Sequence, residues 1–226
     1  MKLRTLASYI IIFSIFYLHA GAQNNVTRPP FFEGSIHYSI NFTDLQGNNI
    51  NKKLAPFFDL EQTMFVDRHN YKMVNKNNQH VKLFQGKHNA YFFFNRDNTA
   101  YKIDQTSKSS QRTRVYDVDD VDTILGYPCK AVKVDGDYRA YIYFYNPDIT
   151  IDIDPYQHYN MEEWNVYLKA SNGALPLRII TIDIRSKFIE DRVATKITPM
   201  KLLLSEFDFP ETVKLRKLKY GMDLIW

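Results

Sequence analysis

Short segments in which apolar and polar residues alternate recur along this chain, and they restrict the folds that it can form. In the first, Ile36, Tyr38, Ile40 and Phe42 alternate with small or polar residues, a period that is typical of a β-strand with one buried face. Similar segments, separated by polar turns, lie at residues 65–66, 71–74, 81–83, 91–94, 101–103 and 115–124. The pattern predicts a mainly β fold built from an antiparallel meander.

Aromatic residues support this interpretation, because 16 Tyr and 16 Phe accompany only 8 Gly and aromatic side chains suit a pleated, half-buried surface. Residues 129–134 and 139–145 are expected to form a hairpin. In its second arm, Tyr141, Tyr143 and Tyr145 share one face of the strand. The opposite face is also apolar, so we expect this arm to lie inside the sheet and to be covered on both sides.

Three regions give weaker patterns. Residues 51–63 fit a short helix. Residues 148–159 are acidic and irregular, and Pro147 limits regular strand pairing there. Residues 165–169 are predicted to form one of the late strands.

The start of the chain is typical of a secretory signal peptide. Lys2 and Arg4 precede an apolar run at residues 6–18, and residues 20–22 (AGA) offer small side chains for cleavage after Ala22. The run is shorter than the roughly 20 residues of a membrane-spanning helix, although an uncleaved membrane anchor stays as the alternative. We therefore expect a periplasmic or secreted protein with no membrane span after cleavage.

One domain is expected after the signal peptide. Removal of 22 of the 226 residues leaves 204, and loss of the two leading basic residues lowers the net charge from +4 to +2. That length can bury a core, and the nearly balanced charge argues against a nucleic-acid partner. We predict a linker at residues 23–30, a domain at residues 31–210 and, at residues 211–226, a tail that is first basic and then apolar, or an edge strand.

Motifs for catalysis or metal binding are missing from the sequence. Cys129 is the only cysteine, so no internal disulfide can form, and we expect it to be a small buried apolar residue. The histidines form no H-x-x-H or H-E-x-x-H pattern, and there is no G-x-S-x-G or phosphate loop. The aspartates at residues 117–122 and 148–154 lack the spacing of a calcium loop. We expect no catalytic residue, no metal and no cofactor, and hence no enzyme.

Four segments resemble a family of secreted proteins from Gram-negative bacteria. Residues 124–131 (ILGYPCKA) are similar to its I-x-G-Y-x-C-K-K block, residues 145–149 (YNPDI) to its W-Y-T-x-D/E-I block, and residues 174–179 (ALPLRI) to its L-P-L-K block. The opening at residues 32–38 (FEGSIHY) also fits. By these blocks the chain resembles DUF4412-type proteins and the related GLPGLI proteins, both of which look like members of the LolA/LppX-like superfamily.

The resemblance implies a strongly curved antiparallel sheet, a LolA-like half-barrel with short helices on its concave side. In the carriers of this superfamily, the concave side holds acyl chains. A lipid or lipoprotein acyl chain is therefore the expected ligand, and an aromatic-rich sheet can shelter such an apolar ligand from water. The candidate ligand-binding residues are Tyr91, Phe93, Tyr141, Tyr143 and Tyr145.

Two other functions stay open at this point. The first is a module for binding an envelope protein partner, which a half-barrel with a filled core and no cavity would favour. The second, and least supported, is a hydrolytic enzyme, which a cleft that gathers His158 and several aspartates would favour.

Overall fold

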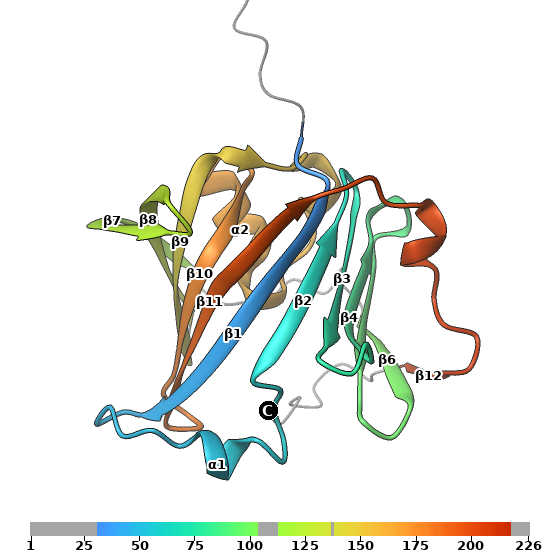
Figure 1. Ribbon diagram of the computed structural model, residues 1–226, viewed down its shortest axis with the longest axis horizontal. Coiled ribbons are helices and arrows are strands. Elements are labelled where there is room, and N and C mark those ends of the chain that lie inside the picture. The colour runs from blue at the N-terminus through green and yellow to red at the C-terminus, as the bar shows by residue number, and fades with distance from the viewer. Residues whose placement is uncertain (1–30, 104–112, 137, 218–226) are drawn as a thin grey trace, which may run out of the picture. The chain divides into compact units, whose positions relative to one another are not determined.

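A computed structural model describes residues 31–103, 113–136 and 138–217, and most of these residues lie in one curved sheet (Figure 1). The predicted signal peptide and linker, residues 1–30, lie outside the described part of the chain. Among the described residues, no helix combines the length and the apolar character needed to cross a membrane.

The described elements are strands, two α-helices and short 3₁₀ helices (η). In chain order they are β1 (Gly34–Asp44), α1 (Asn51–Leu54), β2 (Glu61–Val66), β3 (Asn70–Asn75), β4 (His80–Gln85), η1 (Gly86–His88), β5 (Ala90–Phe94), β6 (Thr99–Ile103), β7 (Arg114–Ile124), β8 (Tyr127–Asp135), β9 (Arg139–Thr150), η2 (Asp154–Tyr156), η3 (Met161–Glu163), α2 (Trp164–Ala170), β10 (Ala174–Asp183), β11 (Phe188–Pro199), η4 (Leu204–Phe207) and β12 (Lys214–Lys217).

Two antiparallel meanders make up the sheet. Strands β1 to β6 pair with their neighbours in sequence, and so do strands β7 to β11. Pairing of β1 with β11 joins the two meanders, and β12 lies parallel to β6 at one edge. The prediction of a mainly β protein with a curved, largely antiparallel sheet is confirmed, and β12 makes the sheet mixed.

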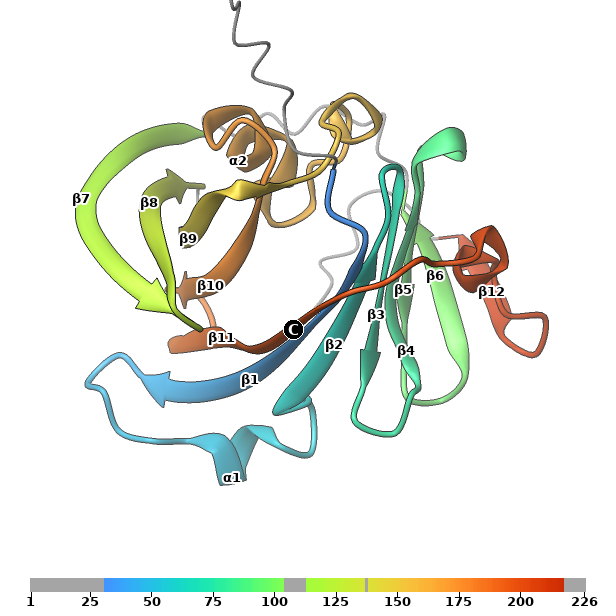
Figure 2. The ribbon, with the colours of Figure 1, turned by 45° about the horizontal axis from the view of Figure 1, so that its top comes forward.

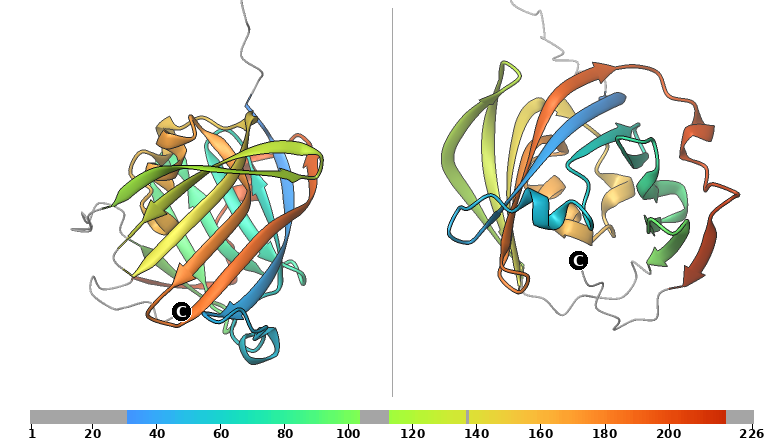
Figure 3. Two further views of the ribbon diagram at one scale, coloured as in Figure 1. Left: turned by 90° about the vertical axis from the view of Figure 1, so that its left-hand side faces the viewer. Right: turned by 60° about the horizontal axis from the view of Figure 1, so that its bottom comes forward.

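Short helices lie on the concave side of this sheet, as expected for a half-barrel. Figure 3 shows the strands curving around the helical segments between β9 and β10, which are η2, η3 and α2. Figure 2 shows α2 close to one end of β7. Helix α2 contacts β7 and β8, and η2 contacts η1. The helices therefore bridge strands that are far apart in the sheet.

An aromatic core fills the space between these helices and the strands. Tyr71 of β3 stacks on Trp164 of α2 with ring centroids 5.3 Å apart, and it meets Tyr159 edge-on at 5.8 Å. The Tyr71 and Tyr159 hydroxyls are hydrogen-bonded to each other, which satisfies two buried polar groups. Phe84 of β4 packs on Tyr159 at 4.8 Å. Cys129 is buried in the same core, as expected.

Two local predictions are wrong. Residues 165–169, predicted as a strand, belong to helix α2, whose Trp164, Tyr167 and Leu168 are buried. These positions share one helical face at i, i+3 and i+4, and packing on the concave surface selects that period over strand propensity. Strand β9 also continues through Pro147 to Thr150, and its pairing with β10 shifts register in this region. The irregular ladder accommodates the missing N–H of proline.

Substitution of Trp164 by alanine tests whether α2 is held by the aromatic core. Trp164 is 4% exposed, so Trp164→Ala should lower the free energy of unfolding by about 3–5 kcal/mol. Urea denaturation followed by circular dichroism measures this change. Leu204→Ala is the control, because Leu204 is 77% exposed and its loss should change stability by less than about 0.5 kcal/mol. Equal effects of the two variants would contradict the assignment of the core.

Candidate functional site

A cavity of about 380 Å³ lies on the concave side of the sheet. Its walls come from β1 to β5 on one side and from β9 to β11 on the other, with η3 and the loops at residues 57–59, 95–98 and 210–213 completing it. Small-molecule sites in proteins have volumes of about 300–1,000 Å³. The cavity is therefore large enough to hold a small ligand.

The register of the sheet places one row of side chains along the cavity wall. Tyr141 on β9 pairs with Thr181 on β10, and Thr181 pairs in turn with Glu190 on β11. Glu190 pairs with Phe42 on β1. All four residues line the cavity, because directly paired residues of neighbouring strands point to the same face.

Aromatic side chains form much of the lining. Phe42, Phe58 and Phe188 pack together with ring centroids 5.3–5.8 Å apart. On the opposite wall, Phe93 of β5 also lines the cavity. Phe57 stands at the solvent side and is 73% exposed. These rings give the cavity an apolar surface that can hold a hydrocarbon or ring system.

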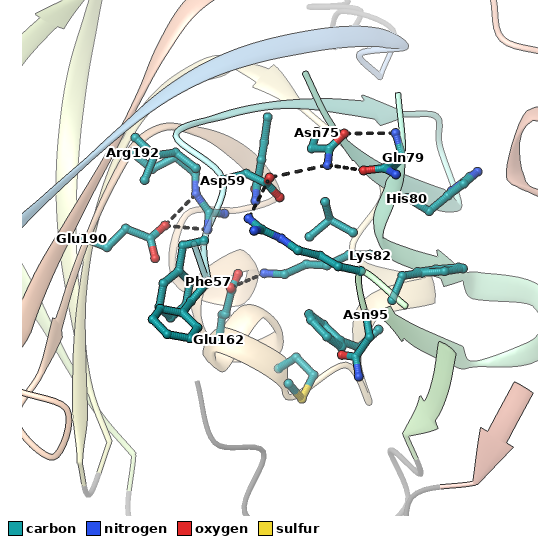
Figure 4. Close-up of a pocket in the computed structure, with 18 of the residues that line it drawn as sticks. Phe57, Asp59, Asn75, Gln79, His80, Lys82, Asn95, Glu162, Glu190 and Arg192 are labelled. Atoms are coloured by element: carbon teal, nitrogen blue, oxygen red, sulfur yellow. Dashed lines mark hydrogen bonds and ion pairs between the residues drawn. The ribbon is translucent and has the colours of Figure 1, made fainter. Parts of the chain in front are cut away.

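A buried ion pair crosses the cavity from the sheet to the helices. Lys82 of β4 is bonded through its ammonium group to the carboxylate of Glu162 in η3 (Figure 4). Glu162 and Glu163 have φ angles of 54° and 55°, a left-handed conformation that is uncommon for residues other than glycine. The backbone carbonyl of Glu162 accepts a hydrogen bond from the Tyr143 hydroxyl. This turn is thereby fixed with its carboxylate directed at Lys82.

Three further ion pairs line the cavity. Arg192 and Glu190 of β11 are 2.7 Å apart (Figure 4). Arg139 of β9 and Asp183 of β10 are also 2.7 Å apart. At the solvent side, Arg96 lies 3.4 Å from Asp59.

Ionisation of Glu162 is favoured by its cationic neighbours. Burial by itself raises the pKa of this carboxyl, but attraction to Lys82, Arg192 and Arg139 outweighs it and lowers the pKa to about 2. Burial lowers the pKa of Lys82, and the Glu162 carboxylate opposes that shift. Burial, together with Lys72, lowers the pKa of His80, so this imidazole is neutral at pH 7.

Some polar groups at the cavity are left without partners. The side chain of Gln62 is buried, and its Oε1 has no hydrogen-bond partner among the described residues. The Nδ1 atom of His80 is likewise buried and unpartnered within the described chain. Asn75 and Gln79, by contrast, are bonded to each other at 3.1 Å (Figure 4).

Of the five ligand-binding residues predicted from the sequence, three line the cavity and two do not. Tyr91, Phe93 and Tyr141 line the cavity. Tyr143 is fully buried and stacks on Tyr167 of α2 at 4.0 Å, and Tyr145 meets the same ring at 6.1 Å. These last two residues belong to the packing beneath α2 and do not line the cavity.

Sequence reasoning missed the charged residues of the site. The signal was present on β4, where Lys82 shares a face with the buried Phe84. Arg192 on β11 likewise shares a face with the buried Ala194. A charge at an inward position of a strand indicates a buried ion pair or a site.

The residues weighed for chemistry lie elsewhere or are already paired. His158 is exposed and does not line the cavity. Within residues 31–103, 113–136 and 138–217, no group of three or more His, Cys, Asp or Glu is arranged to hold a metal ion. The four carboxylates that line the cavity are each ion-paired.

Comparison with known proteins gives likenesses of fold only. No family model matches the chain, and no curated protein matches its sequence, so membership of the DUF4412-type or GLPGLI proteins stays a prediction. Of the solved structures, PNGF-II is similar with 14% identity and a TM-score of 0.47, over 82% of this chain and 32% of that one. The chain thus spans about a third of the length of PNGF-II.

Two smaller proteins are also similar. A LolA superfamily protein from Nitrosomonas europaea is 11% identical with a TM-score of 0.37, over 80% of this chain and 92% of that one. A putative outer membrane lipoprotein-sorting protein domain from Vibrio parahaemolyticus is 8% identical with a TM-score of 0.35, over 83% and 94% of the two chains.

The ionisation of Glu162 predicts a loss of stability in acid. Its pKa is about 2 in the folded protein against 4.5 for an ordinary glutamate, so its contribution is complete above about pH 4.5 and is lost as the pH falls toward 2. Urea denaturation at a series of pH values measures this slope. Glu162→Gln should flatten the slope, whereas Glu61→Gln, at an exposed position, should leave it unchanged. A slope that is the same in all three proteins would refute the assignment.

Substitution of one partner of the Lys82–Glu162 ion pair should destabilise the protein, because the remaining charge loses its counter-ion. Lys82→Met should lower the free energy of unfolding by about 3–5 kcal/mol, because it removes the cation that is hydrogen-bonded to the Glu162 carboxylate. The double variant Lys82→Met/Glu162→Gln should recover much of this loss, as measured in a double-mutant cycle. Lys133→Met provides the control, since the side chain of Lys133 is 36% exposed against 11% for Lys82 and an exposed ion pair is worth at most about 1 kcal/mol. Additive effects of the two cavity substitutions would argue against a coupled pair.

Proposed function

We propose that this protein is a non-catalytic binding protein of the bacterial envelope that holds a lipid, an acyl chain or another largely apolar ligand in the concave cavity. The observation that carries the proposal is the cavity of about 380 Å³ with aromatic walls. The signal peptide predicted from residues 1–22 supports export to the periplasm or the exterior.

The lining favours a ligand with both an apolar and a polar part. Transfer of hydrocarbon from water to an apolar environment is worth about 0.8 kcal/mol per CH₂ group, and the rings around Phe42 and Phe93 provide such an environment. The four ion pairs and the amide of Gln62 line the same space. A ligand with an apolar body and a polar head group therefore matches this lining better than a pure hydrocarbon does.

The two alternative functions gain less support. A module that binds an envelope protein was expected to have a filled core without a cavity. The cavity therefore favours a ligand-binding function over this alternative. A hydrolytic enzyme needs a carboxylate or imidazole that is free to exchange protons. The cavity carboxylates are paired with Lys or Arg, and the phenols of Tyr91 and Tyr141 have pKa values that burial raises above 10.

Ligand occupancy is directly testable. The full-length chain, expressed in a Gram-negative host with its signal peptide and purified without detergent, should carry a lipid that mass spectrometry detects after solvent extraction. The delipidated protein should take up Nile red, an uncharged fluorophore, with saturable fluorescence. A preparation that contains no lipid and does not bind Nile red would overturn the proposed function.

A matched pair of variants locates the site. Thr181 faces the cavity from β10, so Thr181→Trp should fill part of the space and weaken Nile red binding at least about tenfold. Thr195 lies exposed on the neighbouring strand β11, and Thr195→Trp should bind like the unaltered protein. Urea denaturation of both variants shows whether the fold is retained. Equal binding by two folded variants would exclude this cavity as the site.

A further inference from the structure

The charges that line the cavity cancel one another within the cavity. Its lining contains four cationic and four anionic side chains, and each is bonded to a partner that also lines the cavity. The pairs are Lys82–Glu162, Arg192–Glu190, Arg139–Asp183 and Arg96–Asp59. The cavity therefore presents polar groups without a net charge.

In three of these ion pairs, at least one of the two side chains is largely shielded from solvent. The side chain of Asp183 is 2% exposed, that of Arg192 is 8% exposed and that of Lys82 is 11% exposed. A carboxylate or ammonium group on a ligand would leave water and find each potential counter-ion already engaged. A desolvated charge without a partner of its own is strongly unfavourable.

Hydrogen-bonding capacity nevertheless remains for a neutral group. A guanidinium group has five N–H donors, and the bonds from Arg192 to Glu190 use only its Nε and Nη2 atoms. The side-chain Oε1 atom of Gln62 is buried and has no hydrogen-bond partner among the described residues. This oxygen can accept a hydrogen bond from a hydroxyl or amide group on a ligand, while the remaining N–H groups of Arg192 can donate one.

From this balance we infer that the ligand is an uncharged amphiphile, with an apolar body against the aromatic walls and a hydroxyl- or amide-bearing head group beside the ion pairs. A monoacylglycerol or a fatty amide belongs to this class, whereas a free fatty acid or an alkylamine does not. The inference rests on the proposed function, because it specifies the ligand of the same cavity.

Competition between ligands of equal chain length tests the inference. Nile red bound to the full delipidated protein is displaced with the twelve-carbon monoacylglycerol, the twelve-carbon fatty acid or the twelve-carbon alkylamine, each below its micellar concentration at neutral pH. The monoacylglycerol should bind at least about tenfold more tightly than either charged ligand, a difference of about 1.4 kcal/mol.

The outcomes separate this inference from the proposed function. Binding of the fatty acid or the alkylamine at least as tight as that of the monoacylglycerol would overturn the uncharged class and leave the binding function intact. If Nile red does not bind and none of the three ligands is retained, the proposed function fails together with the inference.

Variants that create a net charge provide a second measurement. Glu190→Gln removes the carboxylate 2.7 Å from Arg192, so the affinity for the fatty acid should rise at least about tenfold relative to the monoacylglycerol. Asp59→Asn likewise removes the carboxylate partner of Arg96 and should also raise the relative affinity for the fatty acid. The Arg96–Asp59 pair is more exposed, so we expect the fold to tolerate this substitution. Glu61→Gln, outside the cavity lining, should not change the preference. An unchanged preference in both cavity variants contradicts the charge-balance argument.

Discussion

The antiparallel pairing of β1 with β11 is the interaction on which the rest of the structure depends. It joins residues near the start of the described chain to residues about 150 positions later, over the full length from Gly34 and Pro199 to Asp44 and Phe188. Without it, the β1–β6 meander and the β7–β11 meander would be separate sheets. With it, one curved sheet places Lys82 and Phe93 on one side of the cavity and Glu190 and Arg192 on the other.

The helical segment between β9 and β10 covers one part of the concave face of the sheet and leaves another part open as the cavity. Trp164 and Tyr167 of α2 cover one part of the face and form the aromatic core. The left-handed turn at Glu162 ends this covered part, because its carbonyl is bonded to Tyr143 while its carboxylate reaches Lys82. Backbone strain of this kind persists only where surrounding contacts fix it. The turn is therefore the boundary at which the filled core gives way to the open cavity.

The sequence predicted the strands well because period-two alternation is a local signal. It predicted the shared face of Tyr141, Tyr143 and Tyr145, yet only Tyr141 lines the cavity. Which part of a strand face is covered depends on the helix at residues 164–170, and that segment was predicted as a strand. Partners of buried charges are equally non-local: Lys82 and Glu162 are 80 positions apart. No spacing rule in the sequence connects such residues, because only the formation of the sheet brings them together.

A cavity lined by ion pairs differs physically from one lined by hydrocarbon alone. Replacement of a buried ion pair by apolar residues of similar volume is often neutral or stabilising, so stability does not by itself explain four pairs around one space. Paired charges keep fixed dipoles at the wall without a net field that would attract ions. An empty apolar cavity selects ligands chiefly by size and shape, whereas fixed donors and acceptors also penalise a ligand that leaves them unpaired. For the proposed function, we therefore expect the arrangement of Arg192, Lys82 and their carboxylate partners to contribute more to ligand selectivity than to the stability of the fold.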